Sequence, residues 1–167
     1  MTRAGILRRL FAPLGDIAGT VYGTIVVMGA LVAGSKGEPD PARLGAIVSA
    51  TVLVFWLAHV YSDALGETIT RGRRLDRREL TDVARRELGI PLAAVPPLAA
   101  LLLGAIGVFR ESTAIWIALL IGLVTLAAGG VAYARIERLR PAGTLAVVAV
   151  NVAFGLALVA LKAALSH

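Results

Sequence analysis

The chain has 167 residues, of which 57% are hydrophobic and 17% charged, and its mean hydropathy is +0.80. Soluble domains average about 45–50% apolar and about 25% charged residues, so this composition argues against a soluble enzyme and against a disordered chain. The absence of cysteine excludes disulfides, thiol redox chemistry and Cys-based zinc sites. The formal charge of +6 comes from basic residues beside apolar runs, which favours a membrane protein over a nucleic-acid-binding one.

Five apolar runs have the length of membrane-spanning helices, because a span needs roughly 20 apolar residues to cross about 30 Å of hydrocarbon. The runs cover residues 17–35, 44–66, 90–109, 112–134 and 142–161. We therefore expect an all-α integral membrane protein with a single transmembrane domain over residues 1–167. The short loops and the Arg- and Ala-rich composition are typical of a bacterial cell (inner) membrane protein.

Prolines and run lengths refine these spans. Pro141 is expected to start the fifth helix, and Pro91 suits the start of the third. The Pro96–Pro97 pair predicts a kink or a late start in the third span.

The first run has 19 residues, which exceeds the roughly 7–15 apolar residues of a signal peptide, so we expect a retained helix.

The basic residues predict the orientation of the five spans. With a cytoplasmic N-terminus, Lys36, Arg43, Arg110 and Lys162 lie outside, and the other 13 of the 17 Lys and Arg lie inside. The positive-inside rule therefore favours a cytoplasmic N-terminus and an outside C-terminus.

Residues 71–88, RGRRLDRRELTDVARREL, separate the second and third spans. The loosely helical spacing of the apolar residues predicts a short cytoplasmic amphipathic helix near the lipid headgroups. Four acidic residues are metal-ligand candidates, but seven arginines surround them and are expected to pair with the carboxylates. No aromatic residue is interleaved with these arginines, so no nucleic-acid partner is expected.

The second span carries the residues that point most directly to a function. His59, Asp63 and Glu67 are spaced i, i+4, i+8 and form one stripe on a helix. Charged residues in a span usually mark an ion or proton path. His59 and Asp63 are suitable ligands for a divalent transition metal, and a histidine with a carboxylate is equally a workable proton relay. The structural alternative is that His59 and Asp63 pair with each other or with neighbouring helices, and that Glu67 pairs with Arg71.

Two further residues, Tyr22 and Asp16, extend this candidate proton and transport path. Tyr22 in the first span and Asn151 in the fifth are uncharged polar groups at membrane depth, and we include Tyr22 in the path. Asp16 lies at the start of the first span, either as a helix N-cap or as part of the path.

Glycines recur at every fourth position in the first span. Gly15, Gly19 and Gly23 form GxxxGxxxG, which allows another helix backbone to approach closely. That helix belongs either to the same chain or to a second subunit. We expect a homodimer through the first span.

Three segments resemble the vacuolar iron transporter family. GTVYGTIVVMGALVAG, residues 19–34, is similar to the glycine-rich first span of that family. In AHVYSD, residues 58–63, His59 and Asp63 stand where the family has a methionine and, four residues later, a glutamate. RRELTDVARREL, residues 77–88, is similar to its charged helix after the second span.

The resemblance implies a five-span dimer that exchanges Fe²⁺ or Mn²⁺ for protons along a path lined by the first and second spans. The metal would be transported cargo, and no permanently bound cofactor is expected. The chain departs from the family at its first-span aspartate, because Tyr22–Gly23 occupies that place. The glutamate-rich cytosolic domain of the family is also reduced to one Arg-rich helix.

Two functions remain open from the sequence. The first is proton-coupled transport of a divalent metal. The second is a non-transporting structural or accessory subunit of a larger membrane complex, since Ala-, Leu-, Val- and Gly-rich helices suit helix packing. We do not expect an enzyme, because no Ser-His-Asp arrangement, phosphate-binding loop or HExxH motif is present.

Overall fold

The computed structural model of the chain describes residues 17–35 and 40–165, and within them the regular elements are all helices. The helices are α2 (Ile17–Gly34), α3 (Pro41–Arg71), α4 (Arg77–Arg86), α5 (Gly89–Ala105), α6 (Glu111–Ile136) and α7 (Pro141–Leu165). The all-α prediction is confirmed for the described part of the chain. Asp16 and Gly15 lie outside the described residues.

Four of these helices, α2, α3, α6 and α7, are long and apolar enough to cross a membrane. With 17 residues, α5 is shorter, and it makes a fifth candidate only if it is joined to α4, from which it is bent by 47°. Over its described residues the chain is therefore an all-α, membrane-embedded protein with four or five candidate spans.

The second predicted span, 44–66, is a longer helix in the structure. Asp40 caps α3, because its carboxylate accepts hydrogen bonds from the backbone N–H groups of Ala42 (2.9 Å) and Arg43 (3.0 Å). The helix has 31 residues and ends at Arg71, and the C-cap residue Gly72 has a left-handed φ of 64°.

The third predicted span, 90–109, differs from the structure at its C-terminal end. α5 begins at Gly89 with Pro91 in its first turn, so a late start is wrong. The helix includes both Pro96 and Pro97 and ends at Ala105. As predicted, Pro141 begins α7.

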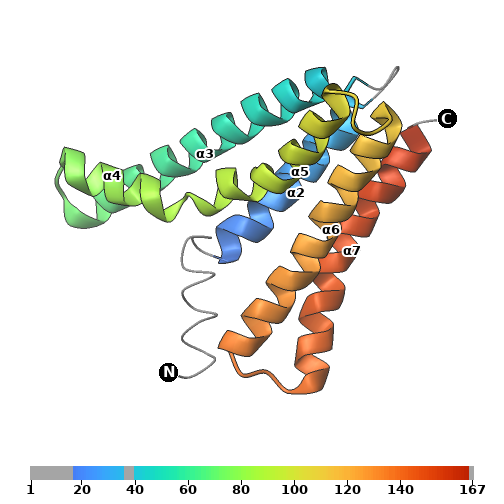
Figure 1. Ribbon diagram of the computed structural model, residues 1–167. Helices are drawn as coiled ribbons and strands as arrows, with labels where there is room; N and C mark the ends of the chain where they lie inside the picture. The colour runs from blue at the N-terminus through green and yellow to red at the C-terminus, as the bar shows by residue number, and fades with distance from the viewer. Residues whose placement is uncertain (1–16, 36–39, 166–167) are drawn as a thin grey trace, which may run out of the picture.

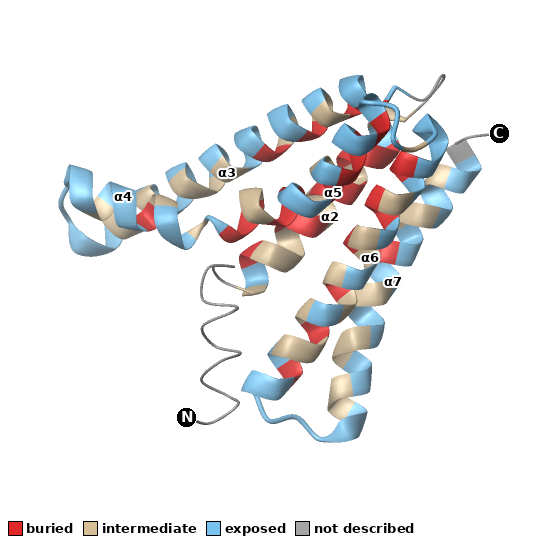
Figure 2. Ribbon diagram, in the orientation of Figure 1, coloured by how far each residue is buried: buried red, intermediate tan, exposed pale blue. Residues whose placement is uncertain are grey.

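The core lies where α2 contacts α3, α5, α6 and α7 (Figure 1). Its largest fully buried side chains include Met28, Leu31, Leu44, Ile90, Leu101, Leu119 and Leu126. Figure 2 shows this buried material along α2 and α5 and at the adjoining end of α3, whereas α7 exposes most of its surface. In a bilayer, lipid or another protein covers such an exposed apolar surface.

Polar contacts inside the bundle join helices to one another. Asn151 on α7 donates a hydrogen bond from Nδ2 to the carbonyl oxygen of Leu126 on α6 (3.2 Å). Lys162 near the end of α7 donates from Nζ to Oγ of Ser35 (2.8 Å). The polar group expected at Asn151 therefore serves helix packing.

The glycine pattern of α2 meets α5 of the same chain. Gly19 and Gly23 are both buried, and a Cβ built on Gly19 would lie 3.5 Å from Cα of Gly89. A Cβ on Gly23 would lie 2.6 Å from the carbonyl oxygen and 2.8 Å from Cα of Ile90. These two glycines therefore have a partner within the chain, and the homodimer through the first span stays a prediction.

Gly23→Ala is expected to destabilise the protein by about 1–3 kcal/mol, because the new methyl group meets backbone atoms of Ile90 that have little freedom to move. The matched control is Gly29→Ala in the same helix, where a Cβ has nothing within 4 Å. Thermal unfolding in detergent would measure both variants. Equal melting temperatures for the two would contradict the close packing of α2 on α5.

Candidate functional site

The polar stripe of α3 continues the face that this helix buries. The buried residues of α3 are spaced three or four apart and all lie in its first half: Pro41, Leu44, Val48 and Val52. Continuing the same spacing leads to His59, and Asp63 and Glu67 follow at four-residue steps along a gradually rotating stripe. No residue of α3 after Val52 is buried, so the stripe lies on the same side of the helix as the buried residues but beyond the buried core.

His59 is held by contacts with α2 and with its own helix. Its ring centroid lies 4.6 Å from that of Tyr22 on α2, and Tyr22 also lies 6.2 Å from Phe55. Nδ1 of His59 is 3.0 Å from the carbonyl oxygen of Phe55. A carbonyl oxygen only accepts, so Nδ1 carries the hydrogen and the lone pair of the neutral ring is on Nε2. Nε2 is thus the atom suited to bind a metal or a proton.

Asp63 lies one helical turn after His59, and its side chain is exposed. Within residues 17–35 and 40–165, the carboxylate forms no ion pair. In the same part of the chain, no three His, Asp or Glu side chains are grouped closely enough to hold a metal. His59 and Asp63 therefore offer at most two ligands, and a full coordination shell requires further donors.

Glu67 connects α3 to α4 through ion pairs. Its carboxylate pairs with Arg71 at 2.9 Å, as the i, i+4 spacing predicts, and also accepts from Arg86 of α4. Arg71 in turn binds Glu79 at 2.6 Å. Glu67 thus acts in joining α3 to α4, which matches the structural alternative for this residue.

Glu79 is the central residue of this connection. It completes a capping box, in which Asp76 Oδ1 accepts from the Glu79 N–H (2.8 Å) and Glu79 Oε2 accepts from the Asp76 N–H (2.9 Å). Both oxygens of Glu79 also accept from Arg73, at 2.6 and 2.9 Å. The hydrogen bonds from the Arg73 guanidinium and the Asp76 amide lower the pKa of Glu79 to about 2. The same Glu79 raises the pKa of Arg73.

The rest of α4 has one buried apolar side chain and one hydrogen bond with α3. Val83 is the buried residue of α4. Trp56 of α3 donates from Nε1 to the carbonyl oxygen of Ala84 (3.3 Å). With Arg71 joined to Glu79, and Trp56 to Ala84, α4 runs antiparallel to the second half of α3.

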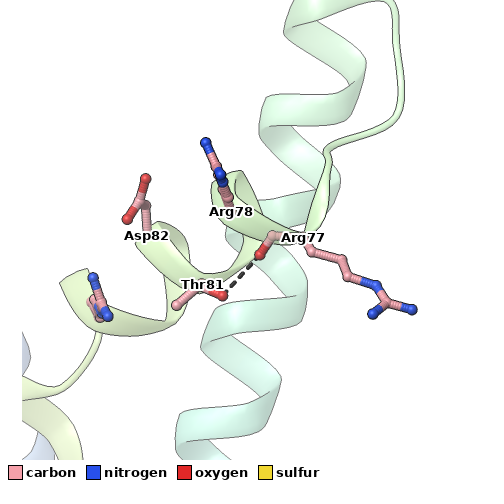
Figure 3. A pocket seen from close by; sticks show the side chains of 5 residues that line it. Arg77, Arg78, Thr81 and Asp82 are labelled. Atoms are coloured by element: carbon pink, nitrogen blue, oxygen red, sulfur yellow. Dashed lines mark hydrogen bonds between the residues drawn. The ribbon is translucent and has the colours of Figure 1, made fainter.

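The outer face of α4 is strongly basic. This face has a shallow hollow, which is lined by Arg77, Arg78, Thr81, Asp82 and Arg85. In Figure 3, Arg78 and Asp82 point to one side of the helix and Arg77 extends away from them. The labelled side chains therefore do not converge on one point.

Sequence reasoning missed the contacts that join distant parts of the chain. Arg86 as a partner of Glu67, and the bond between Trp56 and Ala84, were not predicted. The excess of arginine over carboxylate in residues 71–88 was the available signal for the first. The Trp56 bond has no sequence signal.

Comparisons with protein-family profiles, with curated proteins and with solved structures find no match for this chain. The candidate function therefore depends on the residues described above and on the resemblance stated from the sequence.

Glu79→Gln is expected to loosen α4, because it removes the charge that binds Arg71 and Arg73. Amide hydrogen exchange in residues 77–86 at pH 7 should become several-fold faster, measured by mass spectrometry. Asp82→Asn is the matched control, since it removes an exposed carboxylate from the same helix that forms no ion pair in the described residues. Unchanged exchange in Glu79→Gln would contradict this role.

The acid dependence of the same connection follows from the pKa of Glu79. A carboxyl group with a pKa of about 2 in the folded state and about 4.3 when unfolded stabilises the fold above the unfolded pKa. That stabilisation is lost as the pH falls through about 2. Protection of α4, corrected for intrinsic exchange, should thus be equal at pH 7 and pH 5. A loss of protection by pH 5 would show that another group controls it.

Proposed function

We propose that the protein is a small membrane transporter that exchanges a divalent transition metal, iron or manganese, for protons. The observation that carries this proposal is the pair His59 and Asp63 on the core-facing side of a membrane-embedded helix, with Nε2 of His59 available. Imidazole and carboxylate are suitable donors for Fe²⁺ and Mn²⁺, and both also bind protons.

The path in this proposal runs along α3 between α2 and the ion-paired end of the helix. Tyr22 holds the His59 ring from α2, and Asp63 stands one turn closer to the charged segment. Glu67 is a positioning residue at the cytoplasmic end, because it anchors α4 there. Asp16 belongs to the proposed path as its entrance on the first span. The cytoplasmic placement of α4, near the lipid headgroups, is part of the same proposal.

A homodimer fits the proposal, because two ligands from one chain leave a metal under-coordinated. A second copy would supply a second His59 and Asp63 to a shared site. The resemblance to a dimeric transporter family points the same way. The proposed setting is a bacterial inner membrane.

Asp63→Asn is expected to abolish metal flux while leaving the fold intact, because the amide neither carries a proton nor binds the cation as a carboxylate does. The measurement is Mn²⁺ and Fe²⁺ uptake into liposomes under a pH gradient. Glu137→Gln is the matched control: it removes an exposed carboxylate at the end of α6, away from the stripe. Full flux in Asp63→Asn would overturn the mechanism.

His59→Phe is expected to keep the ring contact with Tyr22 but to weaken Mn²⁺ binding by roughly tenfold or more, because it removes the Nε2 donor. Isothermal titration with Mn²⁺ and a thermal melt of the same sample would separate binding from folding. Unaltered Mn²⁺ affinity with an unaltered melt would remove His59 from the site.

The alternative is a non-transporting structural or accessory subunit of a larger membrane complex. The exposed apolar surfaces of α3 and α7 favour it, because they offer packing surfaces for another membrane protein. It predicts that folded wild-type protein shows no flux, binds no Mn²⁺ and co-purifies with a larger partner. A lone, metal-binding dimer with flux would contradict it.

A further inference from the structure

An open apolar groove lies between the second half of α3 and the segment that leads into α4. α3 lines one side with Ala64, Leu65 and Thr68, and the other side is formed by Leu75 and Leu80. The Thr68 hydroxyl donates to the carbonyl oxygen of Ala64 at 2.8 Å, so it is satisfied within the helix. The lining therefore presents mainly hydrocarbon, and Leu65 and Leu80 are 48% and 46% exposed.

One guanidinium group stands in this groove. Arg74 contributes to its lining and is exposed. Its neighbours Arg71 and Arg73 are neutralised by Glu67 and Glu79, whereas the Arg74 guanidinium has no carboxylate partner among the described residues. The groove thus combines an apolar floor with one uncompensated positive charge.

If α3 crosses a membrane, its length places the groove at the level of the lipid headgroups. α3 has 31 residues and a length of roughly 46 Å, which exceeds the hydrocarbon thickness of about 30 Å. Its last turns, which line the groove, therefore reach the interface. Tyr61 also lines the groove and is 71% exposed, and tyrosine is enriched at this level of a membrane.

We propose that this groove binds an anionic phospholipid of the phosphatidylglycerol type. Its acyl chain lies along Ala64, Leu65 and Leu80, and its phosphate accepts hydrogen bonds from the guanidinium of Arg74. A lipid matches both properties of the groove, since it brings an apolar chain and a negative charge at the same depth. The proposal depends on the membrane placement of α3 and is independent of metal transport.

The test is native mass spectrometry of the full chain in a neutral detergent, titrated with phosphatidylglycerol or with phosphatidylcholine of the same acyl chains. Wild type is expected to retain one phosphatidylglycerol in preference to phosphatidylcholine. Arg74→Gln should weaken that binding by roughly tenfold, the loss of one charge-assisted interaction. Arg77→Gln is the matched control, because it removes an exposed arginine from the same segment outside the groove.

A second variant tests the apolar part of the groove. Ala64→Phe should fill the space and displace the lipid, while its melting temperature and elution in detergent stay those of the wild type. Equal losses in Arg74→Gln and Arg77→Gln would show a general charge effect and overturn the site. Lipid binding that survives Ala64→Phe, or displacement of the lipid by millimolar inorganic phosphate, would also overturn it.

Discussion

The backbone contact between α2 and α5 is the constraint on which the other arrangements depend. Gly23 allows Ile90 to approach so closely that a methyl group has no room. This contact fixes where α5 begins, beside the first half of α2. α3 ends at Arg71, so the chain has to reverse direction and run alongside α3 before α5 can begin. The segment that runs alongside α3 is α4. The position of α4 on α3 is therefore a consequence of glycine packing elsewhere.

The charges of the linking segment serve two separate purposes. Arg71, Arg73 and Arg86 are paired with Glu67 and Glu79, which together form a chain of ion pairs between α3 and α4. Single exposed ion pairs contribute little to stability, so the connected set and the capping box matter more than any one pair. The remaining arginines exceed the available carboxylates. In the proposed membrane placement they give the linking segment a positive surface, and one of them, Arg74, lines the proposed lipid groove.

Local features of the sequence predicted local features of the fold. The start of α7 at Pro141 and the pair of Glu67 with Arg71 both depend on residues within one helical turn, so spacing alone was enough. The contact of Tyr22 with His59 depends on where two helices cross, and apolar periodicity carries no such distance. The predicted span 90–109 extends past the end of α5, because Ile106, Gly107 and Val108 are apolar yet lie after the helix.

The residues of the stripe differ in their surroundings: His59 contacts Tyr22 of a neighbouring helix, as the structural alternative predicts, whereas Asp63 stands outside the ion pairs of the described residues. A structural His59–Asp63 pair would hold the carboxylate by the imidazole, but Nδ1 of His59 is committed to the Phe55 carbonyl and its ring faces Tyr22. The carboxylate of Glu67, in contrast, has a structural role, because two arginines bind it. Asp63, four residues earlier, has an exposed carboxylate outside the ion pairs of the described residues. In the proposed transport function, this carboxylate and the Nε2 atom of His59, one helical turn away, are the groups that bind cations and protons.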